Sequence, residues 1–253
     1  MIGRPARTSR IWLSSLTELL LPRSCIGCGE DGCVWCPGCL DDEFDPVLHR
    51  PDPCPRGMPI MAAAATYSGS VRCAVLAAKE RDRRELDRPL GAMLASAIGL
   101  LLTRGSPGSG SFGPAAIWPN RLRPLWLIPV PASPAARRER SRDHVSDWTR
   151  WTVRWLRAAQ IAACRVPALR RTTSSLDSVG LDAAERAANL SGAFTLAAVR
   201  APPPGTILVV VDDIVTTGAT LVEAAACLST GFDLGQAQLT AAVVAATQRH
   251  RAV

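Results

Sequence analysis

The chain has 253 residues, of which 47% are hydrophobic and 20% are charged, which excludes a wholly disordered chain. No apolar run reaches the roughly 18 uncharged residues that a membrane-spanning helix needs. The nearest approach is the segment 11–21, which follows three arginines and contains Glu18. We interpret it as an amphipathic helix, because no small-residue cleavage site of a signal peptide accompanies it. We therefore expect a cytoplasmic protein without a membrane span.

The net charge of +7 comes from one central stretch. Residues 121–171 hold twelve arginines and three acidic residues, whereas residues 1–60 and 201–253 each carry a net charge of −2. Arginine pairs through bidentate hydrogen bonds with the phosphates of a polyphosphate substrate or of a nucleic acid. The stretch therefore indicates a polyanionic ligand of either class. A solvated helix face is the alternative for any one of these arginines.

The chain has nine cysteines, an odd number, and five of them fall between Cys25 and Cys39. Two C-x2-C units separated by seven residues stand in this segment, and each is able to direct two thiolates at one tetrahedral zinc ion. The glycine after Cys28 suits the tight turn of such a unit. A disulfide-bonded secreted protein is the alternative, but it would leave thiols unpaired. The predicted ligands of a structural zinc ion are Cys25, Cys28, Cys36 and Cys39, with Cys33 as a spare that could replace a member of the second pair.

The remaining cysteines and the histidines indicate no catalytic pair. Cys73, Cys164 and Cys227 lie singly in largely apolar sequence without a nearby histidine, so we expect them in the core. The three histidines are scattered along the chain. Their spacing therefore gives no sign of a catalytic dyad.

Strand and helix patterns alternate after the cysteines. Residues 60–67 predict a strand, 71–79 and 86–102 predict helices, and the Gly/Ser/Pro-rich segment 104–116 predicts a linker or mobile loop. The later predicted strands are 125–131, 166–169, 206–211 and 239–245, and the later predicted helices lie within 143–159, 181–190 and 219–228. This alternation predicts an α/β fold in which helices cover both faces of a parallel sheet.

The strongest site signal follows residues 207–211, a continuous run of β-branched residues and leucine that suits a strand buried on both faces. Asp212 and Asp213 come directly after it, where α/β folds place their ligands. Residues 214–220 (IVTTGAT) then lead into a predicted helix, whose N-terminus offers N–H groups and a positive dipole end to a phosphate. Carboxylates for sugar hydroxyls beside a phosphate site describe a ribose 5-phosphate pocket, whereas capping alone needs only one Asx or Thr residue.

The segment 209–220 (VVVDDIVTTGAT) resembles the phosphoribosyl pyrophosphate signature of type I phosphoribosyltransferases. From about residue 16 to residue 247 the chain resembles the ComF family. The similar features include the paired cysteines, the Lys79 helix, PVP at 129–131, the arginines within 137–142, Gly180-Leu181 with Arg186 and Asn189, and Gly192-Ala193-Phe194. The resemblance implies a type I phosphoribosyltransferase-like parallel sheet flanked by helices in residues 59–253. It also implies a small, zinc-ribbon-like N-terminal module in residues 1–58.

The resemblance also implies roles for single residues. Asp212 and Asp213 match the acidic pair that holds the ribose hydroxyls, and Arg186 lies in a segment similar to the mobile loop that closes over the reacting centre. The residues that match the 5-phosphate loop are Thr216, Thr217, Gly218, Ala219 and Thr220. The residue that matches the pyrophosphate-contacting turn is Ser133, and the candidate cations for the remaining negative charge are Lys79, Arg137, Arg138 and Arg140.

The implied activity is transfer of phosphoribose from phosphoribosyl pyrophosphate to an unidentified base, with release of pyrophosphate and with Mg²⁺ bound alongside the substrate. The alternative is a non-catalytic DNA-uptake (competence) protein that binds single-stranded DNA and a helicase partner, with the pocket as a regulatory site. Trp148, Trp151 and Trp155 stand at helical spacing among arginines and would suit base stacking in that case. The same spacing is expected of a helix that buries one aromatic stripe.

Overall fold

The structure is a computed structural model that describes residues 24–104, 123–133, 136, 138, 142–172, 192–232 and 238–247. Two helices and two strands come first along the chain: α2 (Pro37–Asp41), β1 (Phe44–His49), β2 (Ile60–Thr66) and α3 (Gly69–Glu80). The next elements are the short 3₁₀ helix η1 (Arg84–Leu86), α4 (Asp87–Arg104), β3 (Leu125–Pro129), α6 (His144–Ala158), β4 (Ala163–Arg165) and β5 (Leu169–Arg171). The last are β6 (Phe194–Leu196), β7 (Ile207–Val215), α8 (Ala219–Gly231) and β8 (Gln238–Ala246).

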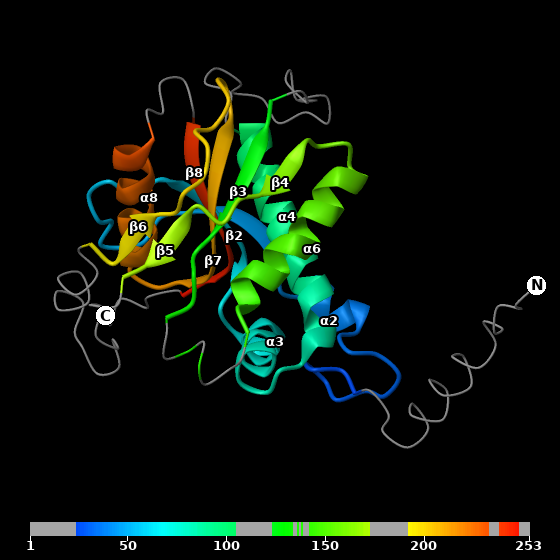
Figure 1. The fold of residues 1–253 in the computed structure, drawn as a ribbon. Helices are drawn as coiled ribbons and strands as arrows, with labels where there is room; N and C mark the ends of the chain where they lie inside the picture. Colours follow the sequence, from blue (N-terminus) through cyan, green and yellow to red (C-terminus); the bar gives the residue numbers. More distant parts are fainter. Residues whose placement is uncertain are drawn as a thin grey trace, which may run out of the picture.

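A six-stranded sheet in the order β1-β2-β8-β7-β3-β4 forms the centre of the fold (Figure 1). β1 is antiparallel to β2, and the other neighbouring strands are parallel. The strands β5 and β6 form a separate antiparallel pair. The predicted α/β fold with a mainly parallel sheet is therefore confirmed.

Successive residues of the central strands pack against different layers, as the pleat of a strand requires. In β7, Val209 and Val211 join a core formed with α3, α4 and α6, whereas Leu208 and Val210 join a core formed with α8 and the β5–β6 pair. Figure 1 shows α4 and α6 together on one side of the sheet and α8 on the other. Both faces of the sheet are thus covered, which explains why the central strands are apolar throughout.

Two parts of the fold differ from what the sequence indicated. β1 was not predicted: it contains Pro46 and carries polar and apolar residues without a regular pattern, and it lies at the edge of the sheet, where such a strand is tolerated. The predicted strand 166–169 is wrong, because residues 166–168 connect two short strands, β4 and β5, which belong to different sheets. The predicted helix 181–190 lies outside the described residues, as do most of the loop 104–116 and the segment 11–21.

One helical stretch in the described part of the chain, Arg84–Thr103, is long and apolar enough to cross a membrane, and half of it is buried inside the fold. The expectation that segment 11–21 comes nearest to a spanning helix overlooked this stretch. It includes α4, which contributes Leu90, Leu94 and Ile98 to the core shared with the sheet. Core helices of soluble proteins meet the same criteria of length and composition, so the finding is weak support for a membrane span.

The tryptophan stripe of α6 packs against α4. Trp148 is fully buried and donates a 2.8 Å hydrogen bond from Nε1 to Asp87, the first residue of α4. Gly91 in α4 leaves room for Trp151, because a Cβ there would lie 2.5 Å from the Trp151 Cβ. Trp155 is 38% exposed at the rim of this contact. The packing interpretation of the stripe therefore holds for its first two members.

Candidate functional site

The four cysteines predicted as metal ligands come together near the start of the described chain. The Sγ atoms of Cys25, Cys28, Cys36 and Cys39 all lie within 4.8 Å of one another, and Cys28 and Cys36 are 3.7 Å apart. Four thiolates at about 2.3 Å from a tetrahedral zinc ion would be about 3.8 Å apart. Cys33 is not a member of this group. The quartet therefore has the donor type and spacing that a metal ion such as zinc requires.

Backbone amides around the quartet favour the thiolate form of Cys25, whereas the neighbouring thiol groups raise the pKa of Cys39 to about 12. The amide groups of Gly27 and Cys36 donate to Cys25 Sγ at 3.4 and 3.3 Å, and the amide of Cys39 donates to Cys36 Sγ at 3.4 Å. Burial of Cys25 works against ionisation, but these amide donors prevail and lower the pKa of its thiol to about 6. The residue after Cys28, Gly29, has a φ of +80°, which confirms the predicted tight turn.

The cysteine cluster is anchored to helix α3. The Ser70 hydroxyl accepts a 3.1 Å hydrogen bond from Trp35 Nε1 and donates one of 2.9 Å to the carbonyl of Cys39. The Glu43 carboxylate accepts from the backbone amides of Ser70 and Val71 in the first turn of α3. A single core includes the buried side chains of the cluster and of the α/β sheet. β1, which falls within residues 1–58, is likewise part of that sheet.

A second candidate site lies beside the end of β3, at a point where β7 continues as far as Val215. Pro129 of β3 is paired with Val211 of β7, and the Val130 amide donates to the Val211 carbonyl at 2.8 Å. From the ends of these two strands the chain continues to α6 on one face of the sheet and to α8 on the other. Such divergence opens a crevice at the carboxyl edge of a parallel sheet, and α/β proteins bind ligands there. Asp212 and Asp213 lie at this position, in the carboxyl-terminal half of β7.

Side chains from two helices contact the carboxylate of Asp213. Lys79 Nζ of α3 and His144 Nε2 of α6 both lie 2.8 Å from Asp213 Oδ2. The other oxygen, Oδ1, accepts a 2.6 Å hydrogen bond from the backbone amide of Ile214. Asp212 Oδ1 accepts one from the amide of Asp213 at 2.9 Å. Helices far apart in the sequence therefore converge on one carboxylate at the sheet edge.

The two neighbouring carboxyl groups have very different proton affinities. Desolvation and the adjacent charge of Asp213 raise the pKa of Asp212 to about 8, against the weaker opposing charges of Lys79 and Arg171. Desolvation also acts on Asp213, but the hydrogen bond from His144 and the charge of Lys79 hold the pKa of Asp213 well below its ordinary value. The direction of the two shifts is the one expected of close carboxylates, which resist double ionisation, and Asp212 is the member of the pair that holds its proton more tightly.

The loop after the acidic pair turns into helix α8 at Gly218. Its φ of +79° and the nearness of Met58, whose Sδ would lie 2.8 Å from a Cβ, make glycine necessary at this position. The amide of Ala219 donates to Thr217 Oγ1 at 3.4 Å. The hydroxyls of the loop and the first amides of α8 therefore share the edge of the sheet with the acidic pair, and the helix dipole favours an anion there.

Of the other predicted site residues, the structure describes Lys79, Ser133 and Arg138, and Arg138 is exposed. Lys79 lies against the acidic pair, as given above, and Ser133 follows the end of β3, where its Oγ accepts a 3.1 Å hydrogen bond from the Ala136 amide. Arg137, Arg140 and Arg186 lie outside the described residues. Of the single cysteines, Cys164 and Cys227 are half-buried, but the expectation of burial is wrong for Cys73. Cys73 points away from the buried face of α3, which consists of residues 71, 74, 75 and 78.

Two further side chains at this site were not expected from the sequence. His144 is 5% exposed and begins α6, but nothing in the spacing of the three histidines connects it with Asp213. Arg171, at the end of β5, contributes positive charge at Asp212. Only the tertiary structure brings these residues to the acidic pair.

In comparisons with known proteins, no family model and no curated protein matches the chain. The class of protein is therefore defined by its own architecture: an α/β protein with a mainly parallel six-stranded sheet, a four-cysteine cluster and an acidic pair at the carboxyl edge of the sheet.

Proposed function

We propose that the chain binds phosphoribosyl pyrophosphate at the carboxyl edge of β7 and is a phosphoribosyltransferase-like protein of the ComF type with a structural zinc ion in its cysteine cluster. One observation carries the proposal: Asp212 and Asp213 directly follow the five buried residues 207–211 of the central strand β7, and the Thr-rich loop leads from the end of this strand into α8. A phosphosugar needs acceptors for its hydroxyls and amide donors for its phosphate. This edge offers both within one short segment.

The ligand roles follow from the groups already described. Asp212 accepts one backbone hydrogen bond and retains acceptor capacity for ribose hydroxyls, whereas Asp213 is held by Lys79 and His144. The residues for the 5-phosphate are Thr216, Thr217, Gly218, Ala219 and Thr220. Carboxylate oxygen is the ligand type that Mg²⁺ prefers, so Asp212 is the residue to hold a magnesium ion that accompanies the pyrophosphate and neutralises its charge.

In the proposed transfer, the bond between C1 of the ribose and pyrophosphate breaks as a base attacks C1, and the pyrophosphate leaves with the electron pair. The chain's own contribution is to position the sugar and to stabilise charge at the crevice. Lys79 is close enough to Asp213 to be shared with an incoming anion. Arg137, Arg140 and Arg186 are further candidates for the leaving group and for closure over the reacting centre.

Replacement of Asp212 and Asp213 together by Asn should abolish binding of phosphoribosyl pyrophosphate, because the hydroxyl acceptors of the site lose their charge. Isothermal calorimetry with Mg²⁺ measures the binding, and pyrophosphate release with a panel of bases measures turnover. The matched control is Asp41→Asn with Asp45→Asn, which removes two exposed carboxylates from α2 and β1. Absence of binding to the unaltered chain, or equal binding by the double variant, would contradict the proposal.

Binding should also depend on pH through Asp212. Its raised pKa of about 8 leaves it protonated at pH 7 before the ligand arrives, and acceptance of two hydroxyl hydrogen bonds requires its ionised form. Affinity should therefore rise by up to about tenfold per pH unit towards pH 8 and level off above it. Calorimetry in buffers of different ionisation enthalpy should show about one proton released per ligand at pH 7.

The control for this pH dependence is Asp212→Asn, which should keep only the titration of the ligand's own phosphates. The same slope in the variant and in the unaltered chain would show that Asp212 is not the titrating group.

A non-catalytic protein that binds single-stranded DNA and a helicase partner is the second candidate. The observation that favours it is the exposed rim of α4 and α6, where Arg88 lies 5.4 Å from the Trp155 ring and Arg154 lies 4.5 Å from the Trp151 ring. Arginine and tryptophan together suit stacked bases and phosphates. Binding of phosphoribosyl pyrophosphate without pyrophosphate release, for every base tested, would favour this candidate.

A further inference from the structure

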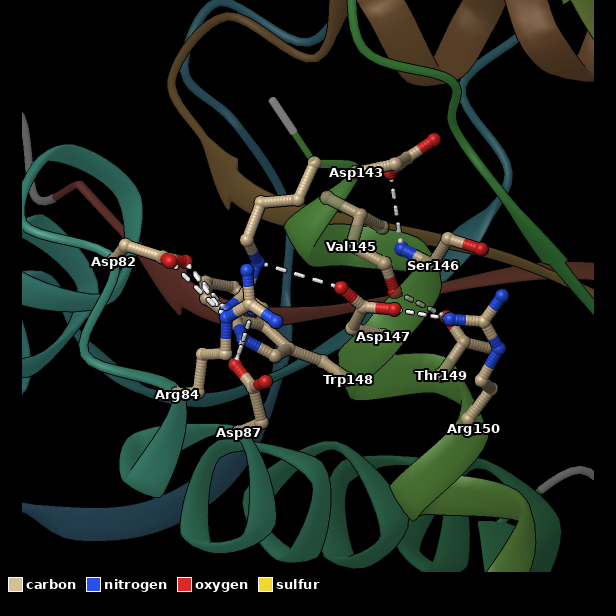
Figure 2. Close-up of polar contacts among 11 residues, drawn as sticks. Asp82, Arg84, Asp87, Asp143, Val145, Ser146, Asp147, Trp148, Thr149 and Arg150 are labelled. Carbon is tan, nitrogen blue, oxygen red and sulfur yellow. Dashed lines mark hydrogen bonds and ion pairs between the residues drawn. The ribbon is translucent and has the colours of Figure 1, made fainter. Parts of the chain in front are cut away.

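A single buried arginine connects the two helices that meet at Asp213. The Arg142 side chain is 8% exposed and contacts three carboxylates: Nη1 lies 3.1 Å from Asp82, Nη2 lies 2.5 Å from Asp87, and Nε lies 3.3 Å from Asp147. Figure 2 shows these three aspartates gathered in one place, beside Arg84 and Trp148. Arginine suits this position because its planar group presents five donors in fixed directions.

The three carboxylates belong to the segments that carry the partners of Asp213. Asp82 directly follows α3 and is three residues beyond Lys79, and Asp147 is three residues beyond His144 in α6. Asp87 begins α4, between these two helices. The guanidinium group of Arg142 is thus an ionic connection between the end of α3 and the start of α6.

A second connection runs from Arg142 to His144 through the core. Asp87 Oδ1 accepts hydrogen bonds from both Arg142 and Trp148 Nε1, and the Trp148 ring lies 5.0 Å from the His144 ring. Trp148 is fully buried, so its ring leaves the imidazole little freedom to move. The orientation of His144 towards Asp213 is therefore coupled to the contact between Arg142 and Asp87.

The other cations near the three aspartates also indicate that Asp87 is the partner specific to Arg142. Asp82 has a second cation, Arg84, at 3.0 Å, and Asp147 has Arg150 as its second cation. Among the ion pairs of the described residues, Asp87 is paired with Arg142 alone. Burial raises the pKa of Asp87 and the ion pair with Arg142 opposes that rise, so loss of the arginine would leave a poorly solvated carboxylate.

We propose that Arg142 is a positioning residue of the site: it fixes the distance between the end of α3 and the start of α6 at which Lys79 and His144 both reach Asp213 Oδ2. The geometry of Asp213 and its partners carries this inference. The identity of the ligand bound at this site rests on the proposed function. The proposal therefore needs one readout that is independent of any ligand.

The test compares Arg142→Gln and Arg142→Lys with Arg84→Gln in the full-length, zinc-loaded chain. Arg84→Gln removes an exposed cation from the same Asp82 and leaves Arg142 in place, so it is the matched control. The ligand-free readout is the ¹⁵N spectrum of the histidine side chains, with His144 assigned through His144→Gln. In the unaltered chain and in Arg84→Gln, the hydrogen-bonded Nε2 proton of His144 should exchange slowly with water. In Arg142→Gln this protection should be lost, and Arg142→Lys should restore it only in part.

The second readout is the affinity for phosphoribosyl pyrophosphate with Mg²⁺. It should fall on the order of 10- to 100-fold in Arg142→Gln and stay unchanged in Arg84→Gln, since small displacements of positioned groups have effects of this size. A folded Arg142→Gln variant with an unchanged His144 spectrum would overturn the proposal and leave Arg142 a purely structural residue. If Arg142→Gln changes the His144 spectrum but phosphoribosyl pyrophosphate binds to none of the proteins, the proposed function is refuted and the positioning role of Arg142 stands.

Should Arg142→Gln fail to fold, Asp82→Asn decides the question, because Asp82 is half exposed and its loss removes the connection from Arg142 to the end of α3 together with the exposed pair with Arg84, which Arg84→Gln removes by itself. We then expect weaker contact between Lys79 and Asp213, observed as faster exchange of the Lys79 ammonium protons in the same ¹⁵N spectra. An unchanged Lys79 signal in folded Asp82→Asn would overturn the proposal.

Discussion

Cys25→Ser should unfold the cysteine cluster and lower the stability of the whole chain by about 3 to 5 kcal/mol, which corresponds to a fall of roughly 10 °C in the melting temperature. The reason is structural: Cys25 and Trp35 are buried in the core that also includes α3 and the sheet, so the cluster cannot loosen alone. Removal of zinc with a strong chelator should have the same effect. Differential scanning calorimetry measures it, and native mass spectrometry should find about one zinc ion per chain.

The matched control for this prediction is Cys73→Ser, because Cys73 is an exposed cysteine on α3 that stands apart from the quartet. Its melting temperature and zinc content should equal those of the unaltered chain. An unchanged melting temperature after complete removal of the metal would show that the metal in the cysteine cluster does not stabilise the fold.

Trp148→Ala should destabilise the chain by about 3 to 5 kcal/mol, as expected for loss of a large, fully buried aromatic side chain. The substitution also removes the hydrogen bond from Nε1 to Asp87, a carboxylate that is itself buried. Urea unfolding followed by circular dichroism measures the loss. Trp148→Phe should restore part of the stability, because it refills most of the volume without the donor.

Trp155→Ala is the control for this prediction, because Trp155 is 38% exposed and its ring packs against Arg88 at the rim of the same helix pair. It should cost about 1 kcal/mol or less. Equal losses for the two variants would contradict the assignment of Trp148 to the core. A loss of affinity for single-stranded DNA in stable Trp155→Ala would favour the second candidate function.

Local patterns were enough to identify the parts of the chain with the strongest constraints. The apolar run of β7 must be buried on both faces, and only a central strand of the sheet offers such a place. The paired spacing of the four cysteines indicates that they form one cluster. The two acidic residues are adjacent in β7, and Gly218 follows five residues later at the start of α8. Short or edge elements such as β1 and β6 carry too few apolar contacts to leave such a pattern.

The sequence by itself determined the α/β class, the cysteine quartet and the position of the acidic pair, because each depends on residues within about one element of one another. The tertiary structure alone decided that Lys79, His144 and Arg142 act on Asp213 or its surroundings, and that the pKa of Asp212 is raised while that of Asp213 is lowered. Residues 79, 144 and 213 come from three elements that meet only when the sheet assembles. Charge interactions depend on distance and desolvation, and neither property is present in a linear pattern of residues.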